Sequence, residues 1–265
     1  MKKIILSFLL FFLFFPVIVE ASSDTARERL SAALEKGIKT YGSVKDYKAV
    51  FQKQEKSGSV LGPQETIFLK FEKPFKIFMG WMNTQKKGLQ VFYERGKHEG
   101  KLAIHKPGLL LGLAPVIFLD QNSPWVKEGS ESYNIEDAGI GPFLNDFSEA
   151  VKKAERNNQL QVVVTPDPRG KTMDVTFAGS KPDDYFAYRV VVHFDEKTSL
   201  TDHMELFDWQ NQPTGVYSYE NLKLNVGNED LEFKQLVDKK LYRLYVPSVI
   251  KPSVSNNFAR ASNKS

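Results

Sequence analysis

Two histidines and one glutamate have the residue types and spacing that could form a metal site. His193 and His203 lie in neighbouring segments that alternate apolar and polar residues, so a hairpin would place both on one sheet face with Glu205. The expected hairpin has two defining pairs: Phe194 with Leu200, and Val190 with Met204. Two imidazoles and a carboxylate can bind zinc, but a solvated sheet face explains the same pattern, and another turn length would separate the histidines. We therefore predict no bound metal and no cofactor.

Other side chains with catalytic potential fit structural roles better. Asp120, Asp183 and Asp184 could serve acid–base chemistry, yet each has Pro, Ser or Asn neighbours, which are typical of turns. Ser, His and Asp are all present, but without a G-x-S-x-G nucleophile elbow. Gly139-Ile140-Gly141 precedes a helical pattern and could bind an anion, but it lacks the strand and the Lys-Ser/Thr pair of a phosphate loop. The sequence accordingly predicts a protein that is not an enzyme.

Residues 1–21 have the pattern of a secretory signal peptide. Two lysines precede a Phe- and Leu-rich run, and Val19-Glu20-Ala21 provides residues that signal peptidase accepts. The alternative is an uncleaved membrane anchor, but the run is short for a bilayer span and contains Pro16 near its end. We expect cleavage before Ser22 and a periplasmic location. Because the chain has no cysteine, lipid attachment at Cys and thiolate chemistry are excluded.

Length, composition and charge favour one domain that does not bind nucleic acid. The 265 residues carry a formal net charge of +4, and the lysines are scattered without a dense basic stripe. A weak attraction to anionic lipid surfaces is compatible with this charge. We expect a single domain over residues 22–245, because that length can bury a core without disulfides. Residues 246–265 are rich in Pro, Ser, Asn and Lys, and we expect a disordered tail there.

Periodicity divides the domain into two sets of strands separated by a helix. Leu30, Leu34 and Ile38 recur at helical spacing near the start, and residues 139–157 form a second amphipathic helical pattern. Short alternating segments with Gly, Pro or Asn turns occupy the stretches 47–104 and 160–224. About ten strands in one sheet cannot stay flat. We predict an α+β fold, in which a large curled antiparallel sheet, an open or incomplete β-barrel, has helices covering its concave face.

The segment 214–233 carries a family resemblance. It resembles the C-terminal signature of the LolA/LolB-like periplasmic lipoprotein and lipid carriers, in which an aromatic-rich strand leads into a polar run, an acidic turn and a Phe. The matching residues are Tyr219, Asn221, Lys223, Asn225, Asp230 and Phe233. Upstream, the stretch 47–81 looks like an uncharacterised bacterial branch of the same superfamily. The resemblance implies a half-barrel closed by helices, with a cavity for acyl chains.

The apolar residues of the first set of strands are the candidate ligand-binding surface. Each follows the alternation of its strand toward the concave side: Phe51, Ile67, Leu69, Phe71, Ile77, Trp81, Val91, Leu102 and Ile104. The apolar stretch 108–119 contains Gly and Pro, so we expect a movable loop over this surface. Its lid residues would be Leu111, Leu113, Ile117 and Phe118. The alternative for these aromatic and aliphatic side chains is an ordinary filled core.

The functional prediction is a secreted, monomeric binding protein that carries a hydrophobic ligand, either a lipid or the acyl chain of a lipoprotein. A transient membrane or membrane-protein partner is a further expectation. Two alternatives are kept, namely an interaction module that senses the state of the envelope and a hydrolase acting on a lipid-like substrate. Burial of methylenes alone can hold such a ligand, at about 0.8 kcal/mol for each.

Overall fold

The computed structural model describes residues 24–83, 86–106, 116–123, 126, 134–167 and 170–227. The expected signal peptide (1–21), the expected tail (246–265) and the lid residues Leu111 and Leu113 lie outside the described residues. Among the described residues, no helix is both long and apolar enough to cross a bilayer.

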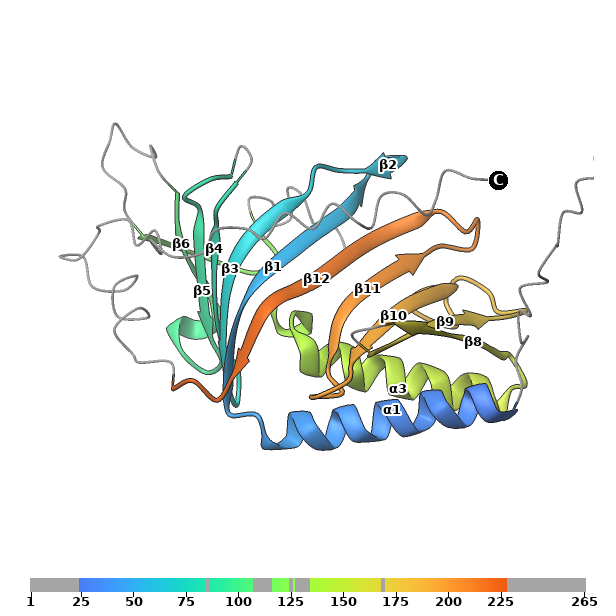
Figure 1. The fold of residues 1–265 in the computed structure, drawn as a ribbon. Helices are drawn as coiled ribbons and strands as arrows, with labels where there is room; N and C mark the ends of the chain where they lie inside the picture. Colours follow the sequence, from blue (N-terminus) through green and yellow to red (C-terminus); the bar gives the residue numbers. More distant parts are fainter. Residues whose placement is uncertain are drawn as a thin grey trace, which may run out of the picture.

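One antiparallel sheet of twelve strands forms the body of the fold (Figure 1). The strands are β1 (Asp46–Ser57), β2 (Val60–Leu61), β3 (Glu65–Glu72), β4 (Lys76–Trp81), β5 (Gln90–Glu94), β6 (Leu102–His105), β7 (Val116–Leu119), β8 (Leu160–Asp167), β9 (Gly170–Phe177), β10 (Arg189–Asp195), β11 (Thr201–Phe207) and β12 (Pro213–Leu224). Their spatial order is β7-β6-β5-β4-β3-β1-β12-β11-β10-β9-β8, and β2 pairs only with β1. The sheet is therefore two meanders joined by the pairing of β1 with β12.

Two α-helices lie together on the concave side of the curled sheet, below the half formed by β8–β12 (Figure 1). They are α1 (Asp24–Ser43) and α3 (Ile140–Arg156). Of the two short 3₁₀ turns, η1 (His98–Gly100) contacts β5 and η2 (Ile135–Asp137) contacts α3. Helix α3 buries the predicted apolar side chains Leu144, Phe147 and Val151. The predicted fold class, a curled α+β sheet with helices on its concave face, is confirmed. We call the helix-bearing side the inner face and the opposite side the outer face.

Side chains of both faces are buried, but in separate clusters. The main core contains residues of both helices, such as Leu30 and Leu144, and inner-face residues of almost every long strand, such as Tyr47 and Val192. A second cluster consists of Phe68, Phe78, Phe92 and Ala103 on β3–β6. These residues alternate with the inner-face residues of their strands, so they lie on the outer face. We call them the outer cluster.

The structure corrects two sequence-based expectations. The end of the expected loop, Val116–Leu119, is strand β7, which pairs with β6. In the β10–β11 hairpin, Val190 lies opposite Leu206 and Phe194 opposite Thr201, in place of Met204 and Leu200. The cause is a turn in which Asp195 accepts hydrogen bonds from the N–H and hydroxyl of Thr198, followed by an irregularity between His193 and Phe194.

Two glycines of α1 provide a test of the helix–sheet packing. A Cβ at Gly37 would meet the backbone oxygen of Ser199 at 2.7 Å, whereas a Cβ at Gly42 would meet nothing within 4 Å. We expect Gly37→Ala to lower the free energy of unfolding by about 1–3 kcal/mol through overpacking. Gly42→Ala should be neutral or stabilise by up to about 1 kcal/mol. Urea unfolding of the two variants checks this, and equal effects would contradict the described docking of α1.

Candidate functional site

The nine predicted surface residues all lie on the inner face, in rows that run across the strands. One row crosses six strands through Ala49, Leu69, Met79, Val91, Ile104 and Ile117. A second contains Tyr47, Phe71, Ile77 and Tyr93, and a third contains Tyr219, Phe51, Ile67 and Trp81. Leu102, opposite Leu119, adds to the inner face on β6. The alternation of the sequence therefore identified a continuous apolar surface.

Burial differs along this surface. Phe51, Ile67, Leu69, Phe71, Ile77, Val91 and Leu102 are buried in the main core. Trp81, Ile104 and Ile117 are half-buried. The more accessible residues are thus at the borders of the surface, next to the polar end of the strands and toward the edge strand β7.

The end of the surface near the helices is closed by aromatic and polar contacts. The Tyr47 hydroxyl accepts a hydrogen bond from the N–H of Ile140 at 3.4 Å, at the first turn of α3. Tyr47 also stacks on Phe71, with ring centroids 5.0 Å apart. The Tyr93 hydroxyl donates to the carboxylate of Glu136 in η2. Gly139 comes directly before α3 at φ 115°, so the Gly139-Ile140-Gly141 motif starts the helix, as the structural interpretation predicted.

The opposite end of the surface carries a cluster of charged side chains. Glu65 accepts hydrogen bonds from Trp81 Nε1 at 2.8 Å and from Lys86 Nζ at 2.5 Å. Lys53 pairs with Glu55 at 2.8 Å, and the Tyr217 hydroxyl donates to Glu55 at 3.0 Å. Lys53 lies opposite both Glu65 and Tyr217 in the sheet. We call Lys53, Glu55, Glu65 and Lys86 the charged rim.

The charged rim is balanced and partly desolvated. Burial disfavours the ionised form of Glu65, but hydrogen bonds from Lys86 and Trp81 outweigh it and lower the pKa of this carboxyl. The side chains of Lys53 and Glu55 are also largely shielded from solvent. Sequence reasoning did not single out these four residues. The available signal was that charged side chains replace apolar ones where the inner-face alternation continues past Phe51 and Ile67.

The two expected lid residues that the structure describes lie on opposite faces of β7. Ile117 lies on the inner face opposite Ile104, whereas Phe118 lies on the outer face opposite Ala103. Phe118 is 43% exposed and its ring centroid is 4.9 Å from that of His98. The sequence missed this because a four-residue edge strand has too few alternations to be distinguished from a loop.

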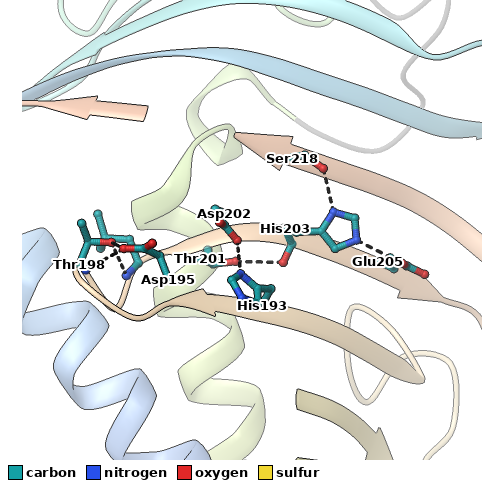
Figure 2. Close-up of polar contacts among 9 residues, drawn as sticks. His193, Asp195, Thr198, Thr201, Asp202, His203, Glu205 and Ser218 are labelled. Atoms are coloured by element: carbon teal, nitrogen blue, oxygen red, sulfur yellow. Dashed lines mark hydrogen bonds and ion pairs between the residues drawn. The ribbon is translucent and has the colours of Figure 1, made fainter. Parts of the chain in front are cut away.

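His193 and His203 lie on the outer face of β10 and β11, each beside a carboxylate (Figure 2). His193 lies directly opposite His203, so the prediction that they share one face is confirmed. Each imidazole has its own carboxylate, because His193 Nδ1 is 2.5 Å from Asp202 and His203 Nε2 is 3.1 Å from Glu205. His203 Nδ1 also contacts the Ser218 hydroxyl at 2.7 Å. Across the described part of the chain, no three His or acidic side chains are placed to hold a metal ion.

The turn interpretation of the aspartates is confirmed. The carboxylate of Asp120 accepts the N–H of Asn122 at 2.8 Å, and that of Asp184 accepts the N–H of Lys181 at 2.8 Å. Side chains that satisfy backbone N–H groups two or three residues away stabilise turns. These carboxylates therefore have a structural explanation that requires no substrate.

The ionisation of Glu65 leads to a pH-dependent prediction. Its pKa is lower in the folded chain than its ordinary value of 4.5, so its contribution to stability is present above that value and is lost as the pH falls through the folded pKa. Glu65→Gln should lower the free energy of unfolding by about 1–2 kcal/mol at neutral pH and reduce the acid sensitivity. Glu149→Gln, at an exposed position of α3, should change stability by less than about 0.5 kcal/mol. Urea unfolding between pH 3 and pH 7 checks the pair, and identical pH profiles for Glu65→Gln and the unmodified chain would contradict the prediction.

Comparison with solved structures finds similar arrangements at low sequence identity. A putative outer membrane lipoprotein-sorting protein domain from Vibrio parahaemolyticus is 13% identical, with a TM-score of 0.38, and the match covers 78% of this chain and 99% of that chain. Lipoprotein LppX from Mycobacterium tuberculosis is 10% identical, with a TM-score of 0.41 and coverage of 74% and 95%. MucB, in its complex with MucA from Pseudomonas aeruginosa, is 11% identical, with a TM-score of 0.43 and coverage of 77% and 60%. We take no function from these likenesses.

The family to which the chain belongs comes from its sequence. No curated protein matches the chain. One family model, described as "Protein of unknown function (DUF1571)", matches residues 44–244. That range contains all twelve strands and helix α3. The protein is therefore a member of the DUF1571 family, as the expectation of an uncharacterised branch anticipated.

Proposed function

We propose that this protein is a non-enzymatic binding protein of the bacterial envelope that holds a lipid or acyl chain on the inner face of β1 and β3–β7. The observation that carries the proposal is the continuous apolar row across these strands. Helix α1 packs against α3 and β8, and α3 against β8 and η2. Among the described residues, neither helix has a comparable interface with β3–β6. The apolar row therefore extends beyond the strands that the described helices contact, and its half-buried end at Ile104 and Ile117 is where a ligand could enter.

The arrangement of the surface favours an amphiphilic ligand. Its apolar rows end at the charged rim, where Lys53, Glu55, Glu65 and Lys86 supply both signs of charge. An acyl chain lying over the rows would place a polar head group beside this rim. The hydrophobic part would supply most of the affinity, because burial of apolar surface scales with the methylenes removed from water.

Chain length is the first test of this proposal. Each additional methylene should contribute about 0.8 kcal/mol, so two additional methylenes should tighten Kd about 14-fold. Titration of the purified protein with saturated fatty acids of increasing length, at concentrations below micelle formation, measures this dependence by calorimetry. Affinity that does not change with chain length would contradict binding by an apolar surface.

A matched set of substitutions locates the site. Ile104→Glu and Ile117→Glu place a carboxylate on the half-buried border of the inner face, and each should weaken acyl binding at least about tenfold. Phe118→Glu adds the same charge next to Ile117 but on the outer face, so it should leave acyl binding unchanged. Retained thermal transitions show that the variants fold. If folded inner-face variants bind as well as the control, the inner face is an ordinary core, and the interaction module becomes the better proposal.

The proposed location rests on the N-terminal sequence. Residues 1–21 combine a basic start with an apolar run and a cleavage sequence, and the chain offers no cysteine for lipidation. We expect the protein extracted from the envelope to begin at Ser22 and to partition with the aqueous phase. N-terminal sequencing after expression in a bacterium with a periplasm measures this. A protein that still begins at Met1 and sediments with membranes would support the uncleaved anchor.

A further inference from the structure

The charged rim repeats one arrangement of side chains twice. In each copy, a carboxylate accepts a hydrogen bond from an aromatic side chain and pairs with a lysine, at distances between 2.5 and 3.0 Å: Trp81–Glu65–Lys86 and Tyr217–Glu55–Lys53. The two copies meet in the sheet, because Lys53 lies opposite Glu65 and also opposite Tyr217. The four charged side chains therefore form one connected group on the inner face.

This group has no net charge and is shielded from solvent. Its two lysines balance its two glutamates. The side chains of Glu65, Glu55 and Lys53 are 11%, 17% and 19% exposed, and Lys86 is the most accessible at 39%. An unbalanced charge costs more free energy in such a place than at an open surface, because little water remains to solvate it. A head group with a net charge would create that imbalance, whereas one that carries both signs would not.

The paired side chains can bind a further polar group without separating. A lysine ammonium has three N–H donors, and a carboxylate accepts up to about four hydrogen bonds. A ligand phosphate can therefore accept from a lysine while a ligand ammonium donates to a carboxylate. Lys53 stands between two acids, with Glu55 about 7 Å along β1 and Glu65 about 5 Å across the sheet, measured along the backbone. Both signs of charge are thus within reach of one short head group.

From the proposed acyl-binding function, we propose that the charged rim selects lipids with a zwitterionic head group, in which a phosphate is next to a primary ammonium. The phosphate faces Lys53 and Lys86, and the ammonium faces Glu55 and Glu65. The acyl chain then starts at Phe51, which follows Lys53 on the inner face and stacks on Tyr219 with ring centroids 4.9 Å apart. A head group with only a phosphate charge meets the same lysines but leaves one negative charge in excess.

Two lysophospholipids that share one saturated acyl chain test this selectivity. Lysophosphatidylethanolamine carries both charges, and lysophosphatidylglycerol carries only the negative one. We expect the first to bind at least about fivefold more tightly, as measured by calorimetry below the concentration of micelle formation. Equal affinities, or tighter binding of the glycerol lipid, would overturn the selectivity and leave acyl binding intact. No binding of either lipid would contradict the proposed acyl-binding function as well.

Opposite charge changes within one ion pair locate the selectivity. Glu55→Gln gives the rim one excess positive charge and should shift the ratio of the two Kd values toward the glycerol lipid by at least about threefold. Lys53→Met gives one excess negative charge and should shift the ratio by a similar factor in the other direction. Loss of the ion pair by itself would move both variants the same way, so shifts in the same direction would overturn the proposal.

An exposed ion pair of helix α3 supplies the matched controls. Glu149→Gln and Lys152→Met make the same charge changes in a pair whose atoms are 3.0 Å apart, and both should leave the ratio unchanged. Retained thermal transitions show that the variants fold. If Lys53→Met does not fold, Lys86→Met at the more accessible lysine is measured in its place. Equal shifts in the α3 and rim variants would mean that overall charge selects the lipid, and the proposal would be wrong.

Discussion

The pairing of β1 with β12 is the constraint on which the rest of the structure depends. β1 has β3 on one side and β12 on the other, so its pairing with β12 joins the two meanders into one sheet. Asp46 fixes the ends of this pair, since its carboxylate accepts N–H groups from residues 226 and 227, and the Asn225 side chain accepts the N–H of Lys45. A shift of one residue would move every side chain of a strand to the other face. The apolar rows and the charged rim both require this register.

Local periodicity was sufficient to predict the helices and strands but not the pairing of β1 with β12. Alternation on β3–β6 predicted the inner-face residues, and the spacing of Leu144, Phe147 and Val151 predicted α3. The partner of β1, however, is about 170 residues away in the chain, and periodicity has no information about contacts at that distance. The number of strands and the twist of the sheet predicted an open, curled sheet, and the family resemblance implied the same half-barrel. Turn chemistry was harder, because the Asp195 turn and the irregularity after His193 together set the β10–β11 register.

The outer cluster shows what an alternation-based interpretation omits. Ile67-Phe68-Leu69, Ile77-Phe78-Met79 and Val91-Phe92-Tyr93 are unbroken apolar runs. Such runs are typical of strands that are buried on both faces, whereas a sheet with one solvated face has strict alternation. Assigning these strands to one apolar face left the central phenylalanine of each run without an explanation. In the structure these three rings are buried together with Ala103, which explains the apolar residue at the centre of each run.

The charged rim is not explained by stability alone. Ion pairs that are shielded from water cost desolvation, and apolar replacements of similar size are often as stable or more so. Lys53, Glu55 and Glu65 nevertheless occupy positions where the inner-face alternation would continue with apolar residues, directly beyond Phe51 and Ile67. The histidine–carboxylate pairs, by contrast, lie on the outer face and do not border the apolar rows. A polar boundary at one end of an apolar surface gives that surface a direction, and a ligand with one polar end would be oriented by it.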